Sequence, residues 1–409
     1  MIPVVVLTIV FFLIAVRRIG TLRLQIWQIM LGGALVVVLT GSIAPLAALR
    51  SINLDVLVFL LGMFLVGQAM EESGYLAQFS YTIFRRAQSP AMLLAATMLV
   101  MGGLSALLMN DTMAIIGTPV VLSFARKAGI RPQFLLMTLA LSVTIGGVVS
   151  PIGNPQNLLV ALSGELENPF VTFGRHLLAP SALCMAATYG ILRLVYRREF
   201  HALRVVQERA LLTDPALVRL CRVSLWLMVV VLVAKVSLVF LDVDLGFRLT
   251  YVALAGALPL LLSKRRVRLV RRVDWTTLLF FAAMFVVMES VWRSGFVQSA
   301  IEASAVDPSS PAVVIGVSIL GSQLVSNVPL VALYLPLLQG VDAGTASYMA
   351  LAAGATMAGT LTILGAASNV IIVQNAERRS GETLSLVEFL RAGLPVTAVC
   401  SVILWLFLV

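Results

Sequence analysis

The fold of this chain is decided by the stretch Ser105-Ala106-Leu107-Leu108-Met109-Asn110-Asp111-Thr112, which places an amide and a carboxylate inside a long apolar run. A similar pattern returns at Ser322-Gln323-Leu324-Val325-Ser326-Asn327. In each copy a proline, Pro119 or Pro336, follows nine residues after the asparagine, and the intervals 327 − 110 and 336 − 119 both equal 217. Serine, leucine, asparagine and proline thus recur at one spacing, which indicates a duplicated unit.

The composition predicts an all-α polytopic membrane protein. Of the 409 residues, 60% are hydrophobic and 12% are charged, whereas soluble domains carry roughly 25% charged residues. Several apolar runs reach the roughly 20 residues that a membrane-spanning helix needs, and they lack the alternation of a membrane β-barrel. The net charge of +10 comes from basic residues in short loops beside these runs. That placement indicates topology in a lipid bilayer and not nucleic-acid binding.

The polar residues of the opening stretch are expected at the tip of a re-entrant hairpin. The apolar segment from about Pro90 to Phe124 is too long for one straight helix across a bilayer, and Met109–Thr112 lies in its middle. Arg85 and Arg86 precede the segment, and further basic residues follow it. Because positive residues stay on one side, the segment is expected to enter, turn and leave on that side.

Each half also contains a helix that is expected to break within the membrane. The first begins near Phe134 and meets Ser150–Asn157, where two prolines and a glycine cannot continue a helix. The second begins near Tyr348 and is interrupted at Gly359 and at Gly365–Asn369. The intervals 365 − 153 and 369 − 157 both equal 212, so the breaks correspond. Irregular backbone at membrane depth survives where protein or a water-filled cavity satisfies it.

The predicted organisation is two inverted repeats, each with five transmembrane helices, one re-entrant hairpin and one broken helix. The first repeat is assigned to residues 1–195, a basic linker to 196–222 and the second repeat to 223–409. Residues 2–16 are interpreted as a retained first helix. An odd number of spans per half inverts the second repeat, as expected of alternating-access transporters. The protein is expected in the inner (plasma) membrane of the cell. The linker around Arg197–Arg219 is expected on the cytoplasmic side, and the loop Gly164–Asn168 on the outside.

The two tips and the two breaks are expected to meet near the membrane midplane and to form the substrate site. Half-helix N-termini, amides and hydroxyls would line it, and no metal or cofactor is expected. The site is predicted to be neutral apart from one carboxylate, with no arginine. The candidate substrate-binding residues are Asn110, Thr112, Thr118, Gly153, Asn154, Gln156, Asn157, Ser326, Asn327, Gly365, Ser368 and Asn369.

Asp111 is the candidate for proton coupling. A carboxylate at the centre of a bilayer costs roughly 2.5–3.5 kcal/mol on the insertion scale, and burial disfavours its charged form. A group that gains and loses a proton there can couple transport to a proton gradient. The alternative interpretation is structural, with Asp111 as the N-cap of the returning hairpin helix.

With hairpins and breaks placed, the chain resembles the ion transporter superfamily. That group contains divalent-anion/sodium symporters, citrate–metal symporters, sodium/proton antiporters and arsenite permeases. In its sodium-coupled dicarboxylate members the tips read Ser-Asn-Thr, whereas here they read Met109-Asn110-Asp111 and Ser326-Asn327-Val328. The Asn110-Asp111 pair followed by Thr118-Pro119 is more similar to the arsenite permease branch. Gly153-Asn154-Pro155-Gln156-Asn157 resembles the permease-like members in general.

The expected function is proton-coupled efflux of arsenite or antimonite by a secondary transporter, not an enzyme. Neutral trihydroxy As(III) needs amide and hydroxyl partners but no countercharge. The alternative is a proton- or sodium-coupled symporter for a small carboxylate or other anion. An alternative from another functional class is a channel-like or scaffold membrane protein, which does not couple transport to an ion gradient. No GxxxxGK[ST] motif occurs, so ATP-driven transport needs a separate ATPase subunit. The sequence leaves both such a subunit and a second copy of the chain possible as partners.

Overall fold

Helices dominate the structure, which is a computed structural model of the chain. It describes residues 2–16, 18–19, 22–23, 25–75, 89–201, 214–240, 248–299 and 306–409. Within these ranges the strands are one antiparallel pair of two residues each, β1 (Arg18–Ile19) and β2 (Leu22–Arg23). Six of the described helices are long and apolar enough to cross a membrane. The prediction of an all-α polytopic membrane protein is confirmed.

The order of helices is the same in the two halves. Each α-helix of the first half corresponds to the helix of the second half whose label is larger by ten, so that α1 corresponds to α11 and α10 to α20. The first half contains α1 (Ile2–Val16), α2 (Ile26–Leu39), α3 (Pro45–Ser51), α4 (Leu54–Ser73), α6 (Pro90–Leu108), α7 (Asn110–Ala128), α8 (Pro132–Val148), α9 (Pro155–Ala161), α10 (Pro169–Val195) and the short η1 (Arg197–His201). The second half contains α11 (Pro215–Phe240), α12 (Thr250–Leu261), α13 (Arg266–Arg272), α14 (Trp275–Arg293), α16 (Pro311–Val325), α17 (Asn327–Gly340), α18 (Thr345–Met357), η2 (Ala358–Thr360), η3 (Ile363–Gly365), α19 (Ala367–Ser380) and α20 (Leu386–Leu408). The inverted orientation of the halves in a membrane stays a prediction.

The two hairpins turn at the same kind of backbone. A single residue, Met109 or Ser326, separates the arms, with φ of 70° and 67°. For a residue other than glycine, a backbone conformation with positive φ costs about 1–3 kcal/mol, and it persists only where the surrounding structure holds it. Each strained junction redirects the chain so that an asparagine, Asn110 or Asn327, becomes the first residue of the second arm.

Several helices begin earlier than the hydropathy predicted. The apolar runs of the sequence predict two helices from about residues 177 and 392, whereas α10 starts at Pro169 and α20 at Leu386. α11 starts at Pro215, so residues 215–222 of the expected linker are helical. The run of basic residues from Lys264 to Arg272 predicts a loop before α14, but it contains α13. Hydropathy reports only the part of a helix inside the hydrocarbon. Two of these starts are fixed by side-chain caps outside the expected span: the Ser385–Glu388 capping box of α20 and Asp214 before α11.

Some predicted features lie outside the described residues. They are the interfacial segment with Arg85 and Arg86, the linker positions Arg204 and Arg209, and the acidic turn Asp242–Asp244.

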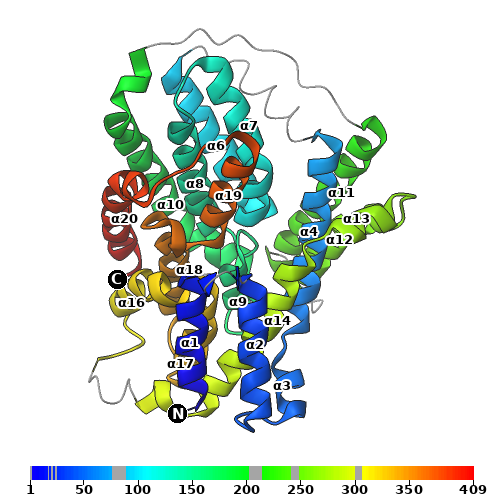
Figure 1. Cartoon of the computed structure of the whole chain (residues 1–409), viewed down its shortest axis with the longest axis vertical. Coiled ribbons are helices and arrows are strands. Elements are labelled where there is room, and N and C mark those ends of the chain that lie inside the picture. Colours follow the sequence, from blue (N-terminus) through cyan, green and yellow to red (C-terminus); the bar gives the residue numbers. More distant parts are fainter. Residues whose placement is uncertain are drawn as a thin grey trace.

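The helices gather into two bundles, and each takes elements from both halves. α1–α4 and α11–α14 pack together as the frame bundle, while α6–α10 and α16–α20 pack together as the hairpin bundle. In Figure 1, α4, α11, α12 and α13 lie together on the right, whereas α6, α8, α10 and α20 lie together on the upper left. The bundles meet where α4 contacts α7 and α9, and where α14 contacts α17.

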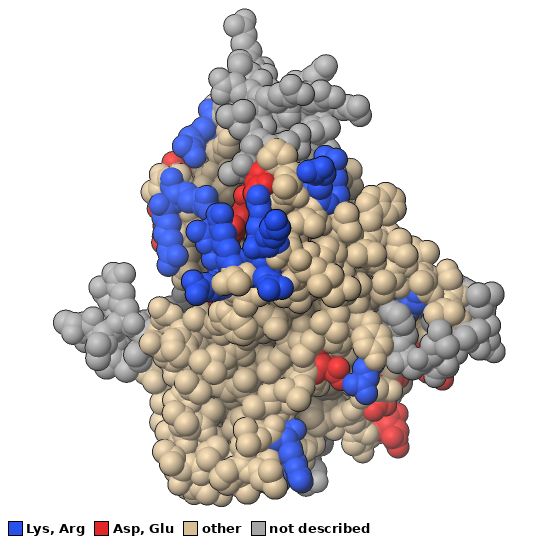
Figure 2. All heavy atoms as spheres, turned by 90° about the vertical axis from the view of Figure 1, so that its right-hand side faces the viewer, with Lys and Arg blue, Asp and Glu red and all other residues tan. Residues whose placement is uncertain are grey.

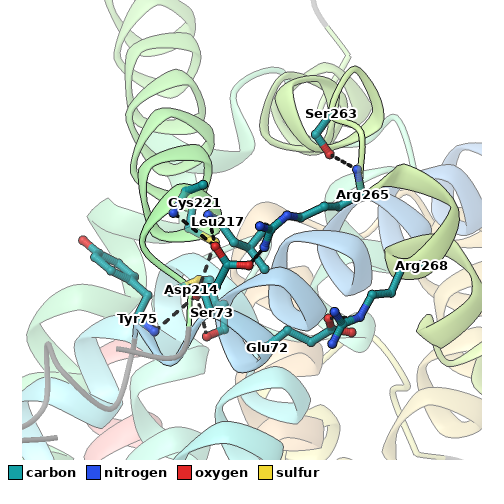
Figure 3. A network of polar contacts seen from close by, with 11 residues as sticks. Glu72, Ser73, Tyr75, Asp214, Leu217, Cys221, Ser263, Arg265 and Arg268 are labelled. Carbon is teal, nitrogen blue, oxygen red and sulfur yellow. Dashed lines mark hydrogen bonds and ion pairs between the residues drawn. The ribbon is translucent and has the colours of Figure 1, made fainter. Parts of the chain in front are cut away.

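Ion pairs tie one end of the frame bundle together (Figure 3). The Glu72 carboxylate pairs with Arg268 at 2.9 Å and with Arg272 at 3.2 Å, which joins α4 to α13. Asp214 caps α11 and also pairs with Arg265. Figure 2 shows Lys and Arg gathered in one region of this side of the molecule, beside a broad uncharged surface. The predicted topology puts all five of these residues on the cytoplasmic side.

Candidate functional site

A cavity of about 890 Å³ lies between the two bundles. One wall comes from the frame bundle, including Phe64, Gly67 and Glu71 of α4. The other comes from both hairpin tips and both helix breaks of the hairpin bundle. The structure therefore brings the two copies of the hairpin motif together, although 217 residues separate them in the sequence. Six predicted site residues line this cavity: Asn110, Asp111, Thr112, Gln156, Ser326 and Asn327.

The first tip is held by both breaks and keeps one acceptor free. The backbone N–H of Asn110 donates to the Gly153 carbonyl oxygen at 2.9 Å. Its side-chain Nδ2 donates to Ser368 Oγ at 3.4 Å. The Oδ1 of Asn110 is buried without a hydrogen-bond partner. A buried unpartnered amide oxygen costs free energy, so a hydrogen-bond donor that reaches it would be stabilised.

The second tip behaves differently. Asn327 Oδ1 accepts a hydrogen bond from the backbone N–H of Val328 at 2.9 Å, so this asparagine satisfies a donor in the first turn of its own helix. At the first tip the N-cap position belongs to Met109, and no side chain caps α7 there. The N-cap interpretation of Asp111 is therefore wrong. Asp111 is the second residue of α7 and is 9% exposed.

The remaining predicted residues do not line the cavity, and all of them except Thr118 of α7 belong to the breaks. Asn154 caps α9, because its Oδ1 accepts from Asn157 N at 2.8 Å. A Cβ atom on Gly153 would overlap the Gly147 carbonyl, and one on Gly365 would overlap that of Ala358, so both positions require glycine. The other buried residues of this set are Thr118, Asn157, Ser368 and Asn369.

Thr356 was not predicted, yet it connects the two breaks. Its Oγ1 accepts from Asn154 Nδ2 at 3.1 Å and from Gln156 Nε2 at 3.2 Å. The same hydroxyl lies 3.0 Å from Asn157 Oδ1. The end of α18 is thus joined to the start of α9 from the other half. A signal was present, because Thr144 and Thr356 share the spacing of the breaks (356 − 144 equals 212).

The prediction of a neutral site without arginine is wrong for the cavity as a whole. Its lining includes Arg272, Arg378, Asp274 and Glu71. Arg378 lies 11 residues beyond the first residue of α19, which is about 16 Å along the helix. The hairpin tips are therefore uncharged except for Asp111, while the rest of the lining carries charges of both signs. These residues lie at helix ends, where their sequence positions resembled ordinary topology signals.

Two hairpin tips and two helix breaks lie around one cavity in a polytopic helical membrane protein, an arrangement typical of membrane transporters. The family model described as citrate transporter (CitMHS) matches residues 9–348, and the chain belongs to this family. This agrees with the resemblance to the ion transporter superfamily. The protein is accordingly a membrane transport protein and not an enzyme.

Similar proteins extend along most of the chain. An uncharacterized transporter of Mycobacterium bovis is 30% identical over 380 residues, covering 87% of this chain and 86% of its own. The human P protein is 25% identical over 472 residues, covering 88% of this chain and 56% of its own. The fold resembles the crystal structure of the YdaH transporter of Alcanivorax borkumensis, with a TM-score of 0.59, 17% identity, and coverage of 99% of this chain and 96% of that one.

Proposed function

We propose that the protein is a proton-coupled secondary transporter of a small carboxylate or related oxyanion, which binds in the cavity between the bundles. The observation that carries this proposal is the convergence of three helix starts. α7, α17 and α19 all begin at residues that line the cavity. Helix N-termini carry partial positive charge and unpaired N–H groups, so they favour anions.

The first tip is the stronger anion donor. The N–H groups of Asp111 and Thr112 lie in the first turn of α7, where a helix offers no acceptor. At the second tip Pro329 has no N–H, and the N–H of Val328 is taken by Asn327. Arg272 and Arg378 also line the cavity, together with the acidic Glu71 and Asp274, so the lining there carries charges of both signs. The anion is thus held at the first tip by the N–H groups of α7.

Asp111 supplies the coupling in this proposal. Its ionised carboxylate repels an anion beside it, and protonation removes this repulsion. Proton and anion therefore bind more favourably together than separately, which is the requirement for symport. The movement in this proposal is a shift of one bundle against the other along their shared boundary. Such a shift opens the cavity to one side of the membrane or to the other, as in inverted-repeat transporters. We also propose that the central linker lies in the cytoplasm and that the protein lies in the inner membrane.

A second candidate is proton-coupled efflux of arsenite or antimonite. It is favoured by the uncharged groups at the tip end of the cavity, where Asn110, Thr112, Gln156, Ser326 and Asn327 can hydrogen-bond a neutral trihydroxy species. The Asn110-Asp111 tip is also similar to that of arsenite permeases. The helix N-termini at the cavity favour the anion, because their partial positive charge stabilises a negative substrate more than a neutral one.

Substrate-dependent thermal stabilisation of the purified protein distinguishes the two. Citrate with and without Mg²⁺, succinate, sulfate, arsenite and antimonite are compared at equal concentration. A ligand at 100 times its Kd adds about 2.7 kcal/mol to stability, so we expect a carboxylate to raise the Tm and arsenite to leave it unchanged. Stabilisation by arsenite or antimonite alone selects the second candidate.

Flux into proteoliposomes then tests coupling. With an imposed pH gradient and no sodium, we expect uphill accumulation of the stabilising substrate. A strict sodium requirement rejects proton coupling. Flux that never exceeds equilibration under any gradient indicates a channel-like protein instead.

A further inference from the structure

We propose that the exposed face of α13, with the residues that flank this helix, binds the anionic headgroups of membrane phospholipids. Three cations and three apolar side chains make up this surface, which we call the α13 face: Lys264, Arg266, Arg271, Leu262, Val267 and Trp275. None of these six residues lines the cavity. The proposal therefore concerns a second class of ligand and does not depend on the transported substrate.

Positive charge is concentrated at α13. Residues 264–272 read Lys-Arg-Arg-Val-Arg-Leu-Val-Arg-Arg, so six of these nine residues are cations. Figure 2 looks onto the side of the molecule on which α13 lies in Figure 1, and it shows Lys and Arg gathered there beside an uncharged surface. Clusters of about four to eight basic residues on the cytoplasmic side of a membrane helix bind anionic lipids, and the predicted topology puts α13 on that side.

Three of the six cations are held by acidic residues of the frame bundle. Arg268 and Arg272 both pair with Glu72, at 2.9 and 3.2 Å. Arg265 pairs with Asp214. Figure 3 shows Arg265 and Arg268 directed toward these two carboxylates. The pairs hold α13 against α4 and the start of α11, and these three arginines are therefore occupied within the protein.

The other three cations are exposed and unpaired. Lys264, Arg266 and Arg271 lie on the surface, and none of them has an acidic partner among the described residues. The carboxylates around α13 are those of Glu72, Asp214 and Asp274. Six cations and three carboxylates leave a net charge of +3 (6 − 3), so the surface needs an anion from outside the protein.

Large apolar side chains lie exposed beside these cations. Leu262 is 74% exposed, Val267 56% and Trp275 48%. The indole N–H of Trp275 donates to the Val270 carbonyl oxygen at 2.9 Å, which fixes its ring beside α13. Leu269, two residues from Val267 and thus on the opposite side of the helix, is buried. A helix with one buried side and an outer face of basic and apolar residues is typical of helices that lie in the membrane interface, where Trp is enriched.

The combination of charge and apolar surface favours a lipid over a soluble anion. Inorganic phosphate can contact only the cations, whereas a phospholipid also has acyl chains that the apolar residues of the α13 face can contact. Since α13 is joined to α4 through Glu72, and α4 lines the cavity, a bound lipid should stabilise the frame bundle. Binding is therefore expected to raise the unfolding temperature.

The triple variant Lys264→Gln, Arg266→Gln, Arg271→Gln tests the proposal, because it removes three charges and leaves every ion pair of α13 intact. The double variant Lys264→Gln, Arg266→Gln replaces it if the triple variant does not fold. The matched control is Arg126→Gln, Arg197→Gln, Arg198→Gln. These three arginines are also exposed and belong to α7 and η1, so the predicted topology puts them on the same side of the membrane.

Thermal unfolding of each purified full-length protein in detergent is followed during titration with phosphatidylglycerol, phosphatidylcholine or inorganic phosphate. We expect phosphatidylglycerol to raise the Tm of the unmodified protein and of the control more than the other two ligands do. In the triple variant, the concentration of phosphatidylglycerol that gives half of this increase should rise at least about tenfold, or about 1.4 kcal/mol.

Three results would overturn the inference. If the control loses as much affinity as the triple variant, the effect comes from overall charge and not from the α13 face. If phosphatidylcholine stabilises the unmodified protein as well as phosphatidylglycerol does, the headgroup charge is not recognised. If inorganic phosphate reproduces the increase in Tm, the ligand is a soluble anion and not a lipid.

Discussion

The side chains of Asn157 and Asn369 hold the two broken helices in the same way, although 212 residues separate them (369 − 157). The Nδ2 of Asn157 donates to the carbonyl oxygens of Gly147, at 3.1 Å, and Ser150, at 3.0 Å. The Nδ2 of Asn369 donates to those of Gly359, at 2.6 Å, and Thr362, at 3.2 Å. Where the helix is interrupted, one amide replaces the backbone N–H groups that a continuous helix would supply.

Asn157→Asp and Asn369→Asp should each destabilise the protein by at least about 2 kcal/mol. The change keeps the size of the side chain but turns a donor into an acceptor that faces carbonyl oxygens. Thermal unfolding in detergent measures the effect. Asn168→Asp is the matched control, since Asn168 makes no side-chain cap bond at the start of α10. Equal unfolding temperatures for all three variants would show that the amides do not hold the breaks.

Gly67→Ala should impair transport through its contact with Thr112. The added Cβ would lie 2.6 Å from Thr112 Cγ2, and such overpacking costs about 1–3 kcal/mol. Thr112→Ser removes that methyl group, so the double variant should recover flux relative to Gly67→Ala alone. Gly103→Ala, where a Cβ meets nothing within 4 Å, controls for the loss of a helical glycine. If the double variant is no better than the single one, the contact does not limit movement between the bundles.

Asp111→Asn should abolish net flux driven by a pH gradient and keep substrate binding within roughly tenfold, or about 1.4 kcal/mol. Asparagine retains the hydrogen-bonding shape of the side chain but cannot exchange a proton. Binding by thermal shift, counterflow and net flux are measured in one preparation. Near-normal net flux would remove Asp111 from the coupling mechanism and leave it a residue that favours the first turn of α7 electrostatically.

Single cysteines should report the predicted topology. In a background where the buried Cys184, Cys221 and Cys400 are replaced, we expect an impermeant maleimide to label Glu167→Cys in intact cells. Arg271→Cys should react only after the membrane is opened. Both positions are exposed in the structure. Labelling of position 271 but not 167 in intact cells would reverse the orientation.

The hairpins and breaks could be predicted because each contains residues that do not fit a continuous apolar helix. Asn110 and Asp111 are polar within an apolar run, and prolines and glycines interrupt what would otherwise be continuous helices. Their recurrence at fixed spacings made the duplication visible. The coincidence of both tips and both breaks around one cavity followed from the same reasoning, and the structure places them there.

The contribution of the frame bundle could not be predicted from sequence. In a membrane protein the faces toward lipid and toward other helices are both apolar, so periodicity does not reveal that α4 faces the hairpin tips. Asp274 and Arg378 stand at helix ends, where charge commonly reports only topology. Their presence in the cavity depends on tertiary packing between segments far apart in the chain.

The interleaving of the two halves in both bundles has a consequence for biosynthesis. Polar groups buried in the first half wait for partners in the second, since Asn110 bonds to Ser368 and Asn154 to Thr356. A nascent chain that stops at the linker therefore contains half of each bundle and no completed cavity. The transporter acquires its binding site only when α19 has been inserted, and until then these first-half asparagines lack their second-half partners.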